Sequence, residues 1–184
     1  RRIKMSDLGD PLLFKQEYPA NAAEAFQVSG QDPLIKPESV LSARKAKDVE
    51  AYGCKALGVD IARFGDDRTV IFPRQGLCAY KPTILRQQRT TDIAAKCAQV
   101  NEEMKDIQTM FVDDTGHWGH GVIDNLHTAG YNPVGIQFHG APIDPRFKNK
   151  RAEMWFTMAE WIKGGAMIPP IPELVPELTT PTYT

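Results

Sequence analysis

The sequence predicts an α/β fold, with a mixed sheet of three antiparallel strands followed by two parallel strands and flanked by helices. Between residues 55 and 87, three short β-branched runs are separated by tight turns, which is typical of an antiparallel meander. After residue 90, segments of helical periodicity alternate with short apolar runs, which is typical of strands joined by crossovers. At 184 residues, the chain is long enough for one domain with a sizeable core.

The antiparallel part begins with the run KALGVD, residues 55–60, which ends on a carboxylate. Gly65, Asp66 and Asp67 turn the chain into a second strand at residues 68–74, and Gly76 turns it into a third at roughly 77–87. The first strand therefore holds Asp60 at an edge of the sheet.

The second half alternates helices and strands. We expect helices at 90–104, 119–129 and 149–163, and strands at 110–113 and 133–138. The last helix carries an apolar stripe made of Met154, Trp155, Met158, Trp161 and Ile162. This order of elements is that of the ribonuclease-H-like fold, although periodicity also permits other mixed α/β folds.

The residues before the first strand are less regular. Pro11 is suited to the first turn of a helix at 11–18, and a short turn or helix follows at 22–26. Residues 27–37 have the composition of a linker. Residues 39–49 predict a basic helix that is mostly solvated.

Composition excludes some functional classes. Three cysteines without metal-type spacing indicate reduced thiols in an intracellular protein. No apolar run approaches ~20 residues, so we expect no membrane span, and no leader resembles a signal peptide. No GxxxxGK[ST] motif occurs, which excludes a P-loop ATP site in this sequence. The formal net charge of −1 neither favours nor excludes nucleic acid.

Two apolar strands from distant parts of the chain end in acids, because the run TMFVDD, residues 109–114, repeats the pattern that ends at Asp60. Mg²⁺ and similar hard cations prefer carboxylate oxygens. Neighbouring strand residues point to opposite faces, so we expect Asp113 to face Asp60 and Asp114 to serve the turn, with Asp114 as a less favoured ligand. Asp67 is a turn residue with an outer-shell role as its alternative. The pattern predicts a shared divalent-metal site.

The connection TGHWGHG, residues 115–121, is rich in glycine and leads into a helix. Such a turn can bring backbone N–H groups close to a phosphate, or it can simply be a tight connection. His117 and His120 have no further Cys or His nearby in the sequence, so the pattern favours two exposed rings over a zinc site.

Basic residues are concentrated at the start of the last helix, in the stretch DPRFKNKR, residues 144–151. This stretch is either a solvated helix start or a clamp on the DNA backbone, with Phe147 interleaved. The residues that would contact DNA are Arg146, Lys148, Lys150 and Arg151.

Three blocks of the sequence resemble, in order and spacing, the C-terminal nuclease domain of phage terminase large subunits. The blocks are GVDIARFGDDRTVI, FVDDTGHWGHGVIDNL and NKRAEMWFTMAEWIKGG. The resemblance covers about residues 50–184, and EYPANAAEAFQVSG resembles the end of the preceding packaging ATPase domain. It therefore implies a helical segment and linker at residues 1–49 and a ribonuclease-H-like nuclease domain at residues 50–184.

The resemblance implies an endonuclease that cuts concatemeric double-stranded viral DNA with two bound ions, Mg²⁺ or Mn²⁺. By the match of motifs, Asp60 and Asp113 take two positions of the catalytic acidic cluster. The implied partners are double-stranded DNA, the portal protein and the terminase small subunit, in the cytoplasm of the host bacterium.

One departure concerns the family's third acid, which follows the region resembling PELTTPTYT. Neither Glu173 nor Glu177 is in the corresponding place. We therefore expect a domain truncated at its C-terminus, with an incomplete cluster, weak metal binding and poor or absent cleavage.

Two alternatives stay open. The first is a non-catalytic module of the same fold that docks to DNA or to the portal. The second is another ribonuclease-H-like nuclease, such as a Holliday-junction resolvase or a recombinase, for which the AEMW helix and the EYPANAAEAF lead-in are not expected. A sugar-kinase or actin-like ATPase would need a second related half, for which the sequence has no room.

Overall fold

The computed structural model describes residues 32–62 and 67–182, so the helices expected at 11–18 and 22–26 lie outside the described residues. The elements in chain order are α4 (Pro37–Lys45), β1 (Lys55–Asp60), β2 (Arg68–Gln75), β3 (Cys78–Ala79), β4 (Thr83–Arg86), α5 (Thr90–Met104), β5 (Ile107–Asp113), the 3₁₀ helix η1 (Thr115–His117), α6 (His120–Thr128), β6 (Val134–Ile136), α7 (Lys150–Lys163) and α8 (Leu174–Thr179). Within the described part of the chain, no helix has the length and hydropathy of a membrane span.

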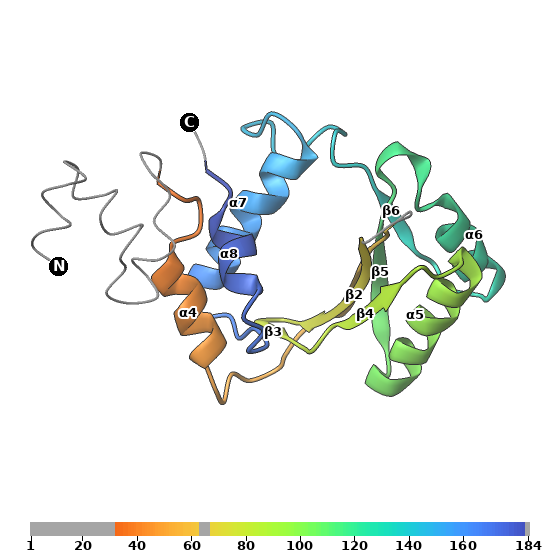
Figure 1. Ribbon diagram of the computed structural model, residues 1–184, viewed down its shortest axis with the longest axis horizontal. Helices are drawn as coiled ribbons and strands as arrows, with labels where there is room; N and C mark the ends of the chain where they lie inside the picture. Colours follow the sequence, from red (N-terminus) through yellow and green to blue (C-terminus); the bar gives the residue numbers. More distant parts are fainter. Residues whose placement is uncertain (1–31, 63–66, 183–184) are drawn as a thin grey trace, which may run out of the picture.

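A single mixed sheet lies between two groups of helices (Figure 1). Its order is β3-β2-β1-β5-β6, and β4 also pairs with β2. β1 is antiparallel to β2 and parallel to β5, which is parallel to β6. This arrangement confirms the predicted fold class. The third strand expected at 77–87 is divided into β3 and β4, because Pro82, which has no N–H for a ladder bond, lies between them.

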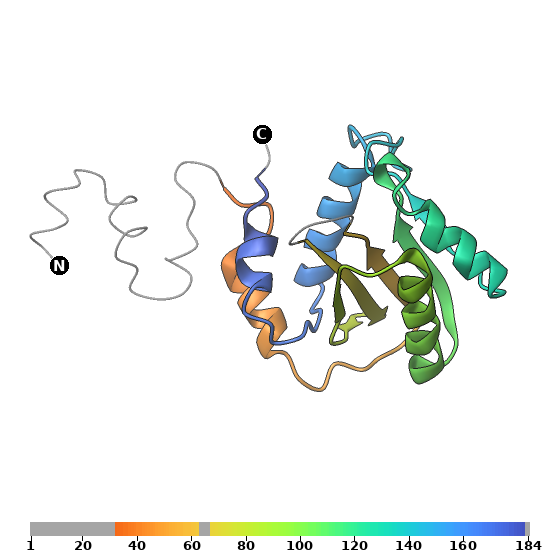
Figure 2. The same ribbon diagram turned by 45° about the vertical axis from the view of Figure 1, so that its right-hand side comes forward.

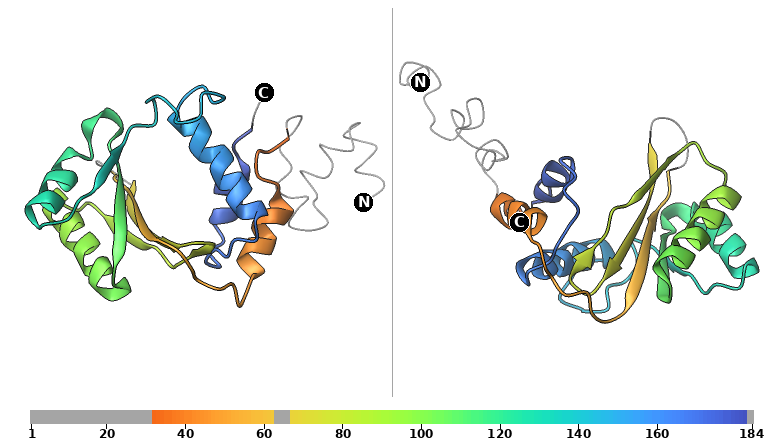
Figure 3. Two further views of the ribbon diagram at one scale, coloured as in Figure 1. Left: turned by 180° about the vertical axis from the view of Figure 1, so that it is seen from behind. Right: turned by 90° about the horizontal axis from the view of Figure 1, so that it is seen from below.

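One face of the sheet is covered by α5 and α6, while α4, α7 and α8 lie on the other side, as the view from behind also shows (Figure 3). Side-chain alternation along β1 and β5 directs every second residue into the covered face. The buried residues of this main core are Leu57, Val59, Ile71, Ile93, Ala94, Cys97, Val100, Met110, Val112, Val122 and Leu126. The intervening residues of the same strands are left on the opposite face.

A second core lies where α4 meets α7 and α8 (Figure 2). Val40 and Ala43, one turn apart on α4, are both buried, and the Ile168 N–H donates to the Ala43 carbonyl at 3.1 Å. The expectation of a mostly solvated helix at 39–49 was therefore wrong, because its few apolar residues lie on one face and pack against the C-terminal helices. The described part of segment 1–49 shares this core with segment 50–184.

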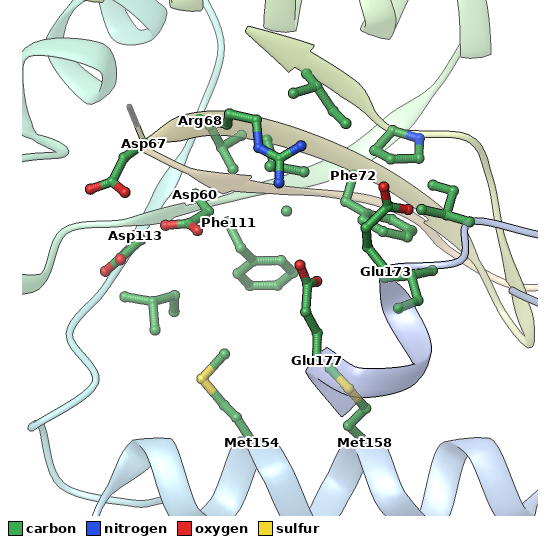
Figure 4. Close-up of a pocket in the computed structure, with 18 of the residues that line it drawn as sticks. Asp60, Asp67, Arg68, Phe72, Phe111, Asp113, Met154, Met158, Glu173 and Glu177 are labelled. Atoms are coloured by element: carbon green, nitrogen blue, oxygen red, sulfur yellow. The ribbon is translucent and has the colours of Figure 1, made fainter. Parts of the chain in front are cut away.

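The long helix α7 divides its apolar stripe between two environments. Ala159 and Ile162 are buried in the second core, whereas Met154 and Met158 are 41% and 38% exposed. These two methionines face the uncovered side of the sheet, across an open space (Figure 4). The short helix α8, which the proline-rich sequence did not predict, closes the end of this space.

Candidate metal-binding cleft

Asp60 and Asp113 end two adjacent parallel strands. Val59 of β1 is in register with Val112 of β5, so the next residue on each strand is an aspartate. The two valines point into the main core, and both aspartates therefore point to the opposite face. Figure 4 shows their carboxylates close together at one end of a cleft.

The cleft has a volume of about 920 Å³ and lies between the open face of the sheet and helices α7 and α8. Much of its lining is apolar: Phe72, Phe111, Ile136, Phe138, Met154 and Met158. The charged residues of the lining are Asp60, Asp67, Arg68, Lys81, Asp113, Glu173 and Glu177. Because an apolar lining excludes some of the water that screens charges, electrostatic interactions within the cleft are strengthened.

The environment of Asp60 disfavours its charged form. Partial burial raises the pKa of this carboxyl, the negative charge of Asp113 raises it further, and a hydrogen bond from the Ile61 N–H opposes both effects. The segment after Asp60 is anchored by the buried Thr69, whose hydroxyl accepts a hydrogen bond from the Ala62 N–H at 3.0 Å. Two carboxylates held this way are stabilised as anions by a cation placed between them.

Asp113 is oriented by its own turn. Its Oδ1 accepts a hydrogen bond from the Thr115 N–H at 2.9 Å, and the Thr115 hydroxyl accepts one from the Phe138 N–H at 3.1 Å. At Gly119, a Cβ atom would lie 2.5 Å from the Asp113 carbonyl oxygen. This close approach explains why glycine is required in the connection, whether or not the turn also binds phosphate.

Asp114 points away from Asp113 and does not line the cleft. It is 6% exposed, and its Oδ1 lies 2.7 Å from Nδ1 of His120. The structure therefore brings Asp113 together with Asp60 and places Asp114 elsewhere. The alternation of side chains, which separated these neighbours in the sequence analysis, is the physical reason.

Asp67 and Arg68, at the start of β2, both line the cleft. Asp67 lies near the two strand-end aspartates, and its negative charge also raises the pKa of Asp60, by less than burial and Asp113 do. The Arg68 guanidinium points into the cleft (Figure 4). Arg68 was not predicted as a site residue, although period-two alternation from Val70 and Phe72, which also line the cleft, was a usable signal.

Glu173 and Glu177 were not assigned to the site, yet both line the cleft from the side of α8 (Figure 4). No local pattern could have placed them there, because α8 reaches the cleft by packing against α4.

Two of the four basic residues at residues 144–151 are engaged with acids. Arg146 donates to Asp144, with a closest distance of 2.6 Å, and these hydrogen bonds hold the pKa of Asp144 below its usual value. Lys150 pairs with Glu153, and its side chain is only 18% exposed. Lys150 is therefore the least accessible of the four to a ligand.

The other two basic residues, Lys148 and Arg151, are exposed. Arg151 lies with its guanidinium carbon 5.3 Å from the ring centroid of Phe138, which lines the cleft, and its N–H donates to the Phe138 carbonyl at 3.0 Å. Lys148 is exposed in the loop that precedes α7. These contacts tie the start of α7 to the segment that follows β6.

Neither a protein-family model nor a curated protein sequence matches this chain. Solved structures do match. The nuclease domain of the large terminase subunit gp2 of bacterial virus Sf6 has a TM-score of 0.65 at 18% identity, over 80% of this chain and 81% of that chain. A mutant of that domain with manganese has a TM-score of 0.62 at 17% identity, over the same fractions of the two chains. The large terminase nuclease from thermophilic phage G20c with bound magnesium has a TM-score of 0.53 at 18% identity, over 74% of this chain and 70% of that chain.

Proposed function

We propose that this chain, which has the fold of large-terminase nuclease domains, is a metal-dependent nuclease. The observation that carries the proposal is the convergence of Asp60 and Asp113 from adjacent strands into one cleft. The metals named with two of the matching structures, manganese and magnesium, are ions that prefer such carboxylate sites. The proposed substrate is concatemeric double-stranded viral DNA.

The proposed mechanism assigns the carboxylates to holding cations rather than moving protons. When bound, two Mg²⁺ or Mn²⁺ ions would activate a water and stabilise the leaving oxygen of a phosphodiester. Asp60 and Asp113 would hold the ions, the Thr115 N–H keeps Asp113 oriented, and Asp67 lines the cleft where it would act in the outer shell. The raised pKa of Asp60, caused by partial burial and by Asp113, indicates that its charged form is unfavourable there and that a bound cation would stabilise it.

In this proposal, positively charged arginine and lysine side chains in and around the cleft hold the DNA backbone. Arg68 and Lys81 line the cleft, and Lys148 and Arg151 are exposed around the start of α7. Positive side chains at such positions supply sequence-independent, salt-dependent affinity for phosphates. Arg146 contributes in competition with Asp144, whereas Lys150 is held by Glu153 and contributes least.

The expectation of weak metal binding rests on a site with two aspartates. Glu173 and Glu177 are the other acids of the cleft lining besides Asp67, and they enter from the opposite wall. If either carboxylate reaches the bound ions, replacing it by glutamine will weaken Mn²⁺ binding. The same proposal assigns the protein to the host bacterial cytoplasm, with the portal protein and the terminase small subunit as partners.

The test combines Mn²⁺ calorimetry with cleavage of supercoiled plasmid. We expect measurable Mn²⁺ binding that is lost in Asp60→Asn and in Asp113→Asn, with any cleavage lost in parallel. Asp124→Asn is the matched control, because Asp124 is an exposed acid on α6, behind the sheet. DNA binding without any Mn²⁺ binding would overturn the nuclease proposal and favour the docking module.

A further inference from the structure

Three side chains gather at the β5–α6 connection, outside the cleft. One ligand atom from each of Asp114, His117 and His120 lies within 4.8 Å of the other two. Among residues 32–62 and 67–182, this is the one group of three or more His, Cys, Asp or Glu residues that meets this distance. We propose that Asp114, His117 and His120 bind a transition-metal ion such as Zn²⁺, at a second site separate from the carboxylate cleft.

The donor set distinguishes the two sites. Two imidazoles and one carboxylate suit Zn²⁺, a borderline ion that proteins bind through nitrogen, sulfur and oxygen. The cleft offers mainly carboxylates, which suit Mg²⁺ and Mn²⁺. Three protein ligands would leave a fourth tetrahedral position for water.

Asp114 is the buried member of the cluster. Its side chain is 8% exposed and lies 2.7 Å from Nδ1 of His120, whose side chain is 58% exposed. A buried carboxylate requires a compensating partner, which His120 supplies through this hydrogen bond. Neighbouring N and O ligands of tetrahedral Zn²⁺ lie about 3.3 Å apart, so small side-chain rotations would let the metal replace the hydrogen-bonding proton.

The backbone brings His117 back toward His120. Gly116 and His117 have φ values of +69° and +65°, and this left-handed region is uncommon for a non-glycine residue. The two imidazole rings consequently meet edge to face, with centroids 4.9 Å apart and an interplanar angle of 77°. Strained conformations of this kind are concentrated at binding sites.

The proposed metal would act on the same turn that orients Asp113. Thr115, which hydrogen-bonds Asp113, and Gly119, which lies against its carbonyl, are both within the segment that the metal would bridge. Zn²⁺ binding therefore stabilises the connection between β5 and α6 without entering the cleft. The inference does not require the nuclease proposal to be correct.

The experiment uses the full chain carrying Asp60→Asn, which removes a ligand from the cleft and leaves the cluster intact. Zn²⁺ is titrated by calorimetry, and Co²⁺ serves as a spectroscopic substitute. We expect one equivalent of Zn²⁺, an intense visible Co²⁺ spectrum typical of tetrahedral nitrogen-containing sites, and a higher melting temperature with Zn²⁺.

His117→Ala is the decisive variant, because His117 is exposed and takes no part in the Asp114–His120 hydrogen bond. We expect it to lower Zn²⁺ affinity at least about tenfold, the effect typical of losing even an outer contact of a metal site. His127→Ala and His139→Ala are matched controls at exposed histidines, and they should change nothing.

Three results would overturn the proposal: no Zn²⁺ binding in the Asp60→Asn chain, equal affinity in the His117→Ala variant, or a weak octahedral Co²⁺ spectrum. Zn²⁺ binding that disappears with Asp60→Asn would assign the ion to the cleft. Absence of Mn²⁺ binding in the wild-type chain, with Zn²⁺ binding retained, would count against the nuclease function alone.

Discussion

Asp60 lies beside Asp113 at the ends of two parallel strands, and partial burial together with the negative charge of Asp113 raises the pKa of the Asp60 carboxyl. The relationship follows from strand register, since Val59 pairs with Val112 and the next residue on each strand is acidic. Like charges held together by backbone geometry are unfavourable without a cation. The metal-free protein should therefore show the cost of this arrangement.

Asp60→Asn is expected to raise the melting temperature of the metal-free protein slightly at neutral pH. The folded-state pKa of Asp60 is raised above the ordinary value of an aspartate by burial and by Asp113. The stability that the protonated carboxyl contributes is therefore fully present at pH values below the ordinary, unfolded-state pKa. It is lost as the pH rises through the higher folded-state pKa. The melting temperatures of the variant and the wild type should converge at pH values below the unfolded-state pKa, where the wild-type carboxyl is also neutral.

Thermal melts in EDTA across this pH range measure the effect, and melts with Mn²⁺ provide the control. With Mn²⁺ the order should reverse, because only the wild type retains the ligand. A variant that is less stable than the wild type in EDTA at neutral pH would contradict the electrostatic account of Asp60.

Lys148→Glu is expected to weaken DNA binding and to reduce the salt slope by about one, the change expected for one lost phosphate contact. Lys150→Glu tests the neighbouring position, where the side chain is already paired with Glu153. The Lys150→Glu substitution should lower DNA affinity less, and folding stability more, than the Lys148→Glu substitution does. Binding isotherms at several salt concentrations, with Lys96→Glu on α5 as the control, measure both slopes.

An unchanged salt slope in the Lys148→Glu variant would remove this residue from the proposed interface. A slope change of equal size in the Lys96→Glu variant would show that the measurement reports net charge rather than contact.

Arg68→Ala is expected to lower DNA affinity without lowering Mn²⁺ affinity. The guanidinium points into the cleft, so it is placed to contact a phosphate, while its positive charge repels cations at the nearby aspartates (Figure 4). Calorimetry with Mn²⁺ and binding to double-stranded DNA separate the two effects. Arg89→Ala, at an exposed residue before α5, is the matched control, and weaker Mn²⁺ binding in the Arg68 variant would refute this role.

Ile35→Ala is expected to destabilise the fold by about 2–5 kcal/mol, the usual cost of truncating a buried isoleucine. Ile35 is 2% exposed in the core shared by α4, α7 and α8. Ile143→Ala is the same change at a residue that is 88% exposed, and it should cost less than about 0.5 kcal/mol. Urea unfolding of both variants tests whether the segment before residue 50 is part of the folded unit.

Equal unfolding free energies for the two variants would mean that burial of Ile35 contributes nothing to stability, and that the segment before residue 50 is not part of the folded unit.

The sequence by itself determined most of the strands, their order along the chain and the two acids that end β1 and β5. These features depend on local patterns: period-two alternation separates Asp113 from Asp114, and apolar runs that stop at an acid mark strand ends. The fold class and the placement of Asp60 and Asp113 could therefore be predicted. Arg68 could have been predicted by the same alternation.

Only the tertiary structure decided which distant segments meet. It brought Glu173 and Glu177 of the α8 region to the wall of the cleft and buried Val40 against the C-terminal helices. These contacts leave no periodic signal, because each depends on how separate elements pack. The grouping of Asp114 with His117 and His120 is local in sequence, but the left-handed turn at His117, which no pattern predicts, brings the three together. Local sequence specifies the direction of a side chain, whereas long-range packing specifies its neighbours.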